Sequence, residues 1–521
     1  MSPATGFMPA TATGPPVSWF TAQTARWIGI AAFVAFVFTG GGRITGSDEI
    51  AMLDLSRAML RGGIAVPASA TLDGPDGRHY TKNHAGQAVL ALPLVAVAEL
   101  ATMRLPIGEA RRELAVRFIV SFFNAAIVAL LLAVFYASIR TLGVAVEGAL
   151  DATLMLGFTT PLWAYAKAFT AEPLQALGLL LALAGSARAA LGQTRGTFWA
   201  GAGVLIAVSA KLSMLPLVLA CLVPLIAARP ITWPVPILAL AAALAGHALY
   251  NQARFGTMLE TGYGAQATLA AYTTPFLTGL YGLLLSSGKG VMWFAPVLWL
   301  AIPGVILLRR AGAVHARVMW SVAIAFVLAL AIYSKFEHWA GDGSFGPRYL
   351  IPLLPILFVP VAFFLHQAGR WRRALAALLA TAGLAVQIGG VAIYFGAQMR
   401  EAGDYPYTRA LNDPEFMRES HFEPRSSPIL GHWKMLIRNT REHLDRKLPK
   451  LGAGTDADPR VGIGAADQVA MLHGLDFWWL YMLYAGLPPL PVVAALLLVL
   501  VTVAWAALRM LVIADEEATI R

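Results

Sequence analysis

The stretch WIGIAAFVAFVFTGGGRITGSDE, residues 27–49, decides the class of fold to which this chain belongs. Residues 27–42 are apolar and uncharged, as a helix that enters a lipid bilayer must be. Asp48 and Glu49 follow shortly after this span. Two adjacent carboxylates are costly to hold beside hydrocarbon, so they indicate a functional site at a membrane surface, either a catalytic base or a metal ligand.

The composition points to the same class. Of the 521 residues, 58% are hydrophobic and 13% are charged, whereas soluble proteins carry about 25% charged residues. The net charge of +10 does not indicate nucleic acid here, because much of the basic excess lies beside apolar spans. Cys221 is the only cysteine, which excludes an intramolecular disulfide and argues against redox chemistry.

Apolar stretches long enough to cross a bilayer recur along the chain. Those that we expect to cross are 27–42, 114–138, 148–166, 173–190, 231–250, 291–308, 316–334, 349–366, 374–395 and 488–511. Residues 198–228 are also apolar, but Lys211 interrupts them, so we expect two short spans there. The sequence predicts an all-α polytopic membrane protein, a bundle of about 12 helices with a range of about 11–13.

Three further apolar stretches are expected to be re-entrant or interfacial, namely 86–103, 275–288 and 476–486. For 86–103 this expectation rests on Pro93, Glu99 and the short length of the stretch. If residues 86–103 do cross the bilayer, the next few segments of the chain lie on the opposite side of the membrane from the side assigned here.

Arginines beside the spans orient the bundle. They are Arg140, Arg188, Arg195, Arg229, Arg309, Arg310, Arg370, Arg372, Arg373 and Arg509. Basic residues favour the cytoplasmic side, so we expect all of these there, with both termini inside. This choice leaves Arg104, Arg111, Arg112 and Arg117 on the outer side.

This orientation divides the chain into four parts. We expect a cytoplasmic tail at 1–25, a transmembrane domain at 26–395, a small extracytoplasmic cap at 396–487, and a last helix with a cytoplasmic tail at 488–521. The main outer loops within the transmembrane domain are 43–113, 251–290 and 335–348.

Candidate binding residues lie in these outer loops. Lys82 and His84 precede the helix expected at 86–103, where a helix N-terminus and nearby cations suit a phosphate. Alternatively, the two residues face lipid headgroups. Lys289 lies between glycines in SSGKG and could hold an anion, or snorkel beside a flexible hinge.

Two further segments supply charged residues on the same expected face. Glu172 precedes Pro173, which also suits an ordinary acidic residue in the first turn of a helix. Glu337, His338 and Arg348 lie in the loop 335–348. Arg348 opens a span on its outer side, which predicts an anion or a carboxylate as its partner.

Three short motifs together resemble the GT-C superfamily of membrane glycosyltransferases. SDEIAMLDLSRAMLRGG (47–63) is similar to the acidic first-loop motif of its branch that holds the aminoarabinose transferases of lipid A and the protein O-mannosyltransferases. HYTKNHAG (79–86) resembles the loop with a phosphate-contacting lysine, although the usual prolines after the lysine are absent. AFTAEP (168–173) resembles the second acidic site, with Glu172 in place of the common aspartate.

The resemblance implies a GT-C-like bundle and an inverting glycosyltransferase of the cell envelope. Such an enzyme moves a sugar from a polyprenyl-phosphate donor to a hydroxyl of a lipid, glycan or protein acceptor, on the outer face of a bacterial inner membrane. It implies that Lys82, Lys289 and Arg348 neutralise the phosphate, with His84, Glu337 and His338 as further substrate-binding residues.

The resemblance also implies roles for the three acids. Asp48 would be the base, Glu49 would orient the acceptor or a metal, and Glu172 would be the second acid. Together their oxygens could hold a divalent metal such as Mg, Mn or Ca, which the residues alone leave open. Two other classes stay possible from the sequence: a transporter or flippase of a lipid-linked or anionic substrate, and a scaffold that binds partners through its cap.

Overall fold

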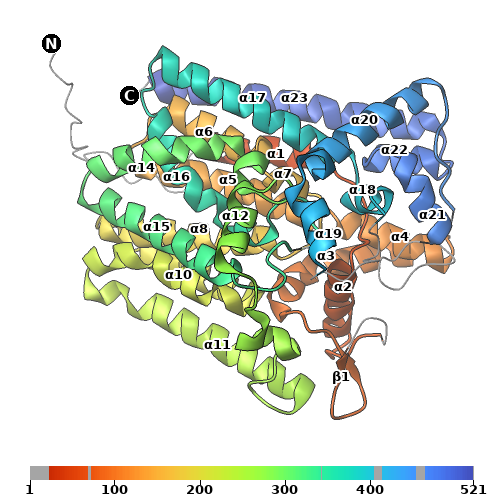
Figure 1. Ribbon diagram of the computed structural model, residues 1–521, viewed down its shortest axis with the longest axis horizontal. Helices are drawn as coiled ribbons and strands as arrows, with labels where there is room; N and C mark the ends of the chain where they lie inside the picture. The colour runs from red at the N-terminus through yellow and green to blue at the C-terminus, as the bar shows by residue number, and fades with distance from the viewer. Residues whose placement is uncertain (1–22, 68–71, 342, 404–412, 453–463, 520–521) are drawn as a thin grey trace.

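The computed structural model describes residues 23–67, 72–341, 343–403, 413–452 and 464–519. Most of the expected N-terminal tail and parts of the expected cap therefore lie outside the described residues. The described chain is helical apart from one hairpin of two short strands, β1 (Leu72–Asp73) and β2 (His79–Tyr80). This confirms the prediction of an all-α protein (Figure 1).

Long apolar helices run alongside one another and form the bundle. Its helices are α1 (Gln23–Phe38), α5 (Phe123–Thr141), α6 (Val146–Phe158), α8 (Glu172–Ala190), α9 (Gly196–Ala210), α10 (Leu215–Cys221), α11 (Pro234–Phe255), α14 (Ala301–Arg310), α15 (Ala313–Tyr333), α16 (Leu354–Leu365), α17 (Arg370–Ala392) and α23 (Pro489–Thr519). Among the described residues, eight helical segments are long and apolar enough to cross a membrane, and four shorter ones are apolar. The chain is thus a multi-pass membrane protein.

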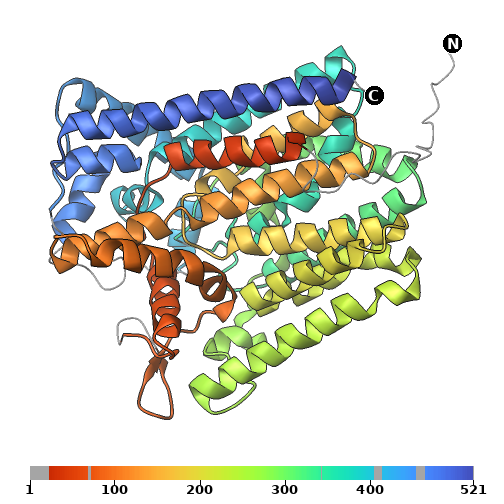
Figure 2. The same cartoon turned by 180° about the vertical axis from the view of Figure 1, so that it is seen from behind.

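The first and last helices of the bundle are neighbours. In Figure 2, α1 lies between α5 and the long C-terminal helix α23, and contacts between these helices are extensive. Trp27 and Trp505 meet edge to face, with 4.9 Å between their ring centroids. The first and last described helices are therefore packed against each other.

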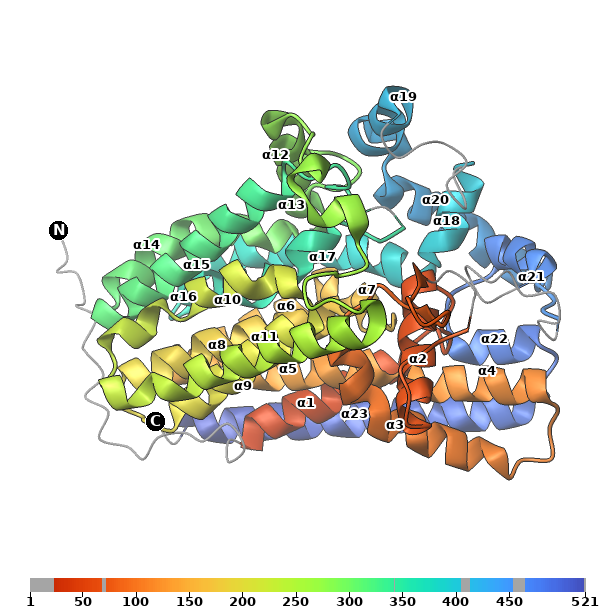
Figure 3. The same ribbon diagram turned by 90° about the horizontal axis from the view of Figure 1, so that it is seen from below.

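The remaining α-helices lie mainly at one end of the bundle. They are α2 (Ser47–Leu60), α3 (Ala85–Met103), α4 (Glu109–Val120), α7 (Leu162–Tyr165), α12 (Phe276–Leu285), α13 (Val291–Phe294), α18 (Phe395–Glu401), α19 (Pro414–Met417), α20 (Pro428–Leu444), α21 (Ala465–Ala470) and α22 (Trp478–Tyr484). Figure 3 shows α2, α3, α4 and the α18–α22 group at this end. By length and composition α3 also qualifies as a span, so the expectation that 86–103 does not cross stays a prediction.

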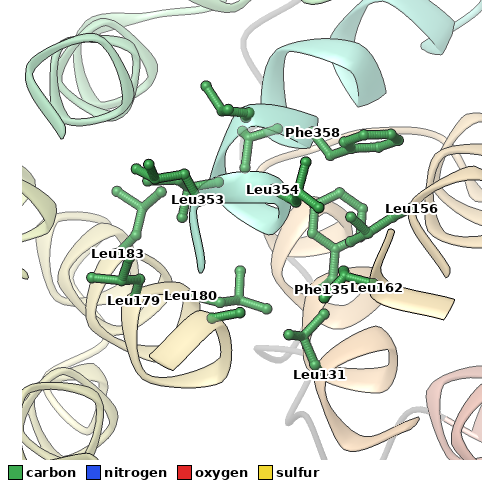
Figure 4. Close-up of a cluster of buried hydrophobic side chains, with 14 of the residues drawn as sticks. Leu131, Phe135, Leu156, Leu162, Leu179, Leu180, Leu183, Leu353, Leu354 and Phe358 are labelled. Atoms are coloured by element: carbon green, nitrogen blue, oxygen red, sulfur yellow. The ribbon is translucent and has the colours of Figure 1, made fainter. Parts of the chain in front are cut away.

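The central helix of the bundle is α8, which is buried along almost its whole length. Small residues let α9 approach it closely: a Cβ atom on Gly185 would lie 2.3 Å from the backbone nitrogen of Ala200. Close backbone approach through small residues is how membrane helices pack without a hydrophobic driving force. Leucines of α8 belong to the same buried cluster as Phe135 of α5 and Phe358 of α16, and Leu354 lies between the two sides of this cluster (Figure 4).

At the end of the bundle, α2 packs on α3. Met52, Leu53 and Leu55 of α2 are buried, whereas Leu60 is 43% exposed. Arg57 of α2 pairs with Glu99 of α3 (2.6 Å). The helix is thus held by other protein elements.

Candidate active site

Asp48 and Glu49 stand in the first turn of α2, but their side chains serve different purposes. The Oε2 atom of Glu49 accepts hydrogen bonds from the backbone N–H groups of Thr45 (3.0 Å) and Gly46 (2.8 Å). Its Oε1 atom accepts one from Phe169, just before α8 (2.7 Å). Glu49 therefore ties the start of α2 to the start of α8, and a direct catalytic role for it stays a prediction.

Asp48 points to an arginine that also binds the second acid. Arg348 Nη2 lies 3.0 Å from Asp48 Oδ2, and Arg348 Nε lies 2.6 Å from Glu172 Oε1. Three segments that are far apart in the sequence meet here: the start of α2, the first residue of α8, and the loop before α16. The structure thus brings together three predicted site residues and gives Arg348 the carboxylate partners that its position predicted.

The two acids differ in access. The Asp48 side chain is 40% exposed, whereas that of Glu172 is 5% exposed and its Oε2 atom has no hydrogen-bond partner among the described residues. Burial by itself would raise the pKa of Asp48, but the charge of Arg348 and its hydrogen bond outweigh this effect and lower the pKa below its ordinary value. Asp48 is therefore an accessible, ionised carboxylate at neutral pH.

Glycines shape the loop that delivers Arg348. Gly341 and Gly346 have φ values of 59° and 74°, a backbone region that favours glycine. A Cβ atom on Gly341 would also lie 2.8 Å from the Cβ atom of Arg348. Larger residues here would displace Arg348 from its two carboxylates.

Two lysines add positive charge to this site. Lys82 is exposed, and its Nζ atom lies 5.6 Å from the centre of the Tyr263 ring. Lys211 lies between α9 and α10, with its Nζ atom 5.3 Å from the centre of the Tyr349 ring. The charges of both lysines act on Asp48 and lower its pKa further. Lys211 was missed as a site residue, although its position within an apolar run was the signal.

His84 reaches the same region but not as a cation. It precedes α3, and its ring meets His247 edge to face at 4.8 Å and stacks on Tyr263 at 5.8 Å. Burial, together with the charges of His247 and Lys211, lowers the pKa of His84 well below its ordinary value. A neutral His84 would contact a substrate through hydrogen bonds and not through charge, and its role in substrate binding stays a prediction.

The remaining predicted binding residues make other contacts. Lys289 is buried and its Nζ atom donates to the backbone oxygen of Ser344 (2.8 Å), in the loop before Arg348. His338 lies 3.4 Å from Glu337 and 3.0 Å from the side-chain nitrogen of Gln266. These contacts thus place Lys289 against the loop before Arg348, and they pair Glu337 with His338.

The predicted three-acid metal site is not formed. Among the described residues, no group of three His, Cys, Asp or Glu side chains is close enough to hold a metal ion. The physical reason is that the Glu49 carboxylate binds backbone N–H groups, while Arg348 lies between Asp48 and Glu172.

A second buried charge network was missed by sequence reasoning. Asp476 lies 2.7 Å from Arg43 and 3.0 Å from Lys167, and it accepts a hydrogen bond from Tyr481 (2.9 Å). Burial alone would raise the pKa of Asp476, but the charges of Arg43 and Lys167 hold it well below its ordinary value. The network joins the segment after α1, the turn before α8 and the region of α22. No local motif around Asp476 signals it.

Comparisons with known proteins give one structural likeness. No family model and no curated protein matches the chain. Among solved structures, the apo form of an oligosaccharyltransferase from Archaeoglobus fulgidus is similar, with 12% identity and a TM-score of 0.43 over 80% of this chain. The match covers 64% of that protein. A likeness of this size does not establish a shared family.

Proposed function

We propose that this chain is an inverting glycosyltransferase of the GT-C type. It moves a sugar from a polyprenyl-phosphate donor to a hydroxyl acceptor at the outer face of the membrane. One observation carries the proposal: an accessible carboxylate, Asp48, stands beside Arg348 with Lys82 and Lys211 close by, at one end of a bundle of apolar helices. A base beside clustered cations suits attack by a hydroxyl and departure of a phosphate.

The site supports a single displacement. Asp48 takes the proton of the acceptor hydroxyl while that oxygen bonds to the anomeric carbon of the donor. The bond from this carbon to the phosphate oxygen breaks, and the polyprenyl phosphate leaves with the electron pair. A retaining mechanism would need a second reachable carboxylate, yet Glu172 is buried and bound to Arg348. The product therefore has the inverted anomeric configuration.

Arg348 couples donor binding to the strength of the base. While it binds Asp48, it lowers the pKa of that carboxyl and weakens it as a base. A donor phosphate drawn to Arg348 and the exposed Lys82 competes for the guanidinium. As Arg348 turns towards the phosphate, the pKa of Asp48 rises and the base becomes stronger where the donor is in place.

Substitution of the base tests the proposal. In lipid nanodiscs, the wild-type chain is expected to release polyprenyl phosphate from a set of polyprenyl-phosphate hexoses and pentoses when sugar or lipid acceptors are present. Asp48→Asn should lower kcat about 10²- to 10⁴-fold, because only the proton transfer is lost, while donor KM changes little. Asp48→Glu, which keeps a carboxylate, should retain part of the activity. Equal kcat in Asp48→Asn and the wild type would contradict the assignment.

A further inference from the structure

A cleft in the cap region lies apart from the carboxylates of the candidate active site. It offers about 330 Å³ of accessible space and is lined by α18, α19, α20 and the turn before α20. Sites for small molecules start at about 300 Å³, so the cleft has room for a small ligand. In Figure 1, α18, α19 and α20 lie together at the end of the bundle that carries α2.

The lining of the cleft combines apolar faces with hydrogen-bonding groups. Phe395 is half-buried and supplies aromatic surface, whereas Phe416 is buried at the edge of the lining. Gln398 is 8% exposed, and none of the described residues bonds to its side-chain amide. Lys434 is exposed and forms no ion pair within the described part of the chain. Glu401 is held in place by Arg438 (2.7 Å).

Among classes of small ligand, this lining suits a sugar best. A sugar ring presents C–H faces to aromatic surfaces, and its hydroxyls both donate and accept, as an amide and a carboxylate require. The charges of the lining are mixed, because Lys289, Arg425 and Lys434 stand beside Glu401 and Glu419, and a mixed lining suits a neutral polar ligand better than a polyphosphate. A lipid tail would leave the amide of Gln398 without a partner.

The cleft adjoins the loop that delivers Arg348. Lys289 and Gly343 line it, and Lys289 donates to Ser344, four residues before Arg348. We propose that the cleft binds a sugar unit of a glycan acceptor, a different unit from the one whose hydroxyl reacts. This inference rests on the proposed glycosyl transfer, and it narrows the acceptor class to a glycan of at least two sugar units.

Gly431 of α20 lines the cleft, so a large residue substituted at this position would occupy the space of the ligand. A Cβ atom there would lie 2.8 Å from Gln398 Nε2, the movable end of a side chain, so Gly431→Ala should be tolerated. Gly431→Phe would place a ring in the cleft. Gly246→Phe on α11 is the matched control, because a Cβ atom at Gly246 meets nothing within 4 Å.

Saturation-transfer NMR on the full chain in nanodiscs tests the proposal without turnover. The probes are neutral oligosaccharides of glucose, mannose, galactose or N-acetylglucosamine. At least one should receive saturation from the wild type, from Gly431→Ala, from Gly246→Phe and from Asp48→Asn. Gly431→Phe should lower that signal at least tenfold at an unchanged unfolding temperature. If Gly431→Phe does not fold, the double variant Gln398→Ala with Lys434→Gln should show the same loss.

Three outcomes would overturn the proposal. One is that no oligosaccharide gives a signal. Another is that the signal persists in the cleft variants but disappears in Asp48→Asn, which would place the sugar at the active site. The third is that inorganic phosphate displaces the sugar, which would make the cleft an anion site. Donor cleavage, measured on the same preparations, reports separately on the proposed transferase activity.

Discussion

At the scale of single residues, Arg348 explains why the two acids of the site differ. It binds the accessible Asp48 and the buried Glu172 at once, so its charge offsets both. The backbone N–H groups that bind Glu49 give it a different function from its neighbour. Adjacent residues on a helix do not share a face, so the pair Asp48–Glu49 could not act as one unit. The sequence places the two acids together without showing this divergence.

The pH dependence of kcat/KM should show the effect of the Arg348 charge on the pKa of Asp48. Because Arg348 lowers the folded-state pKa of Asp48, kcat/KM in the wild type should stay constant down to acidic pH and fall only below the ordinary aspartate value of about 3.9. Arg348→Gln should move this acidic limb to higher pH, since only the weaker effects of Lys82 and Lys211 then oppose the rise in pKa that burial causes. Lys211→Gln should move it in the same direction by less. A limb at the same pH in all three proteins would contradict the charge coupling.

The stability of the folded chain should show the same dependence on Arg348. Arg348→Met removes the charge that compensates the buried Glu172, which costs about 3–5 kcal/mol when one partner of a buried pair is lost. Glu172→Gln in the same chain should restore much of the loss, because no buried charge then stays unpaired. Unfolding of the single and double variants in mixed detergent micelles measures both changes. A double variant as unstable as Arg348→Met would contradict this account of the pair.

At the scale of elements, the contact between α8 and α9 fixes the position of Glu172. Gly185 and Gly203 allow the two backbones to touch, and Glu172 stands at the start of the helix that they position. Gly185→Leu should destabilise the fold by about 1–3 kcal/mol through overpacking, and should lower transfer activity with it. Gly246→Leu, on the exposed side of α11, is the matched control and should change neither. Equal unfolding of the two variants would contradict this role of the α8–α9 contact.

Element positions were easier to predict than the contacts between elements. Apolar length located α5, α8, α15 and α17, because a bilayer demands long uncharged helices. The sequence predicted an anion or a carboxylate as the partner of Arg348, but it did not identify Glu172 as that partner. By contrast, the paths of loops decide where Lys289 and His338 point, and tertiary packing creates the Asp476 network. Neither the path of a loop nor a tertiary contact leaves a periodic pattern in the sequence.

At the scale of the whole molecule, the bundle carries its candidate site at one end. The loop after α1, the start of α8 and the loop before α16 converge there, beside the cap elements α18–α22 (Figure 3). A transporter or flippase would move its substrate without breaking a bond. The arrangement of an accessible base beside clustered cations instead favours bond cleavage at a membrane surface. This arrangement is the reason that we propose transfer, and not transport, for this site.

The stereochemistry of the product tests this central claim most directly. The wild-type chain in nanodiscs is incubated with a polyprenyl-phosphate sugar of known anomeric configuration and a glycan acceptor, and the glycosidic linkage formed is assigned by NMR. We predict a product of inverted configuration, formed at least 100-fold more slowly by Asp48→Asn, within the range of about 10²- to 10⁴-fold for loss of a general base. A product of retained configuration, or an undiminished rate in Asp48→Asn, would contradict the account.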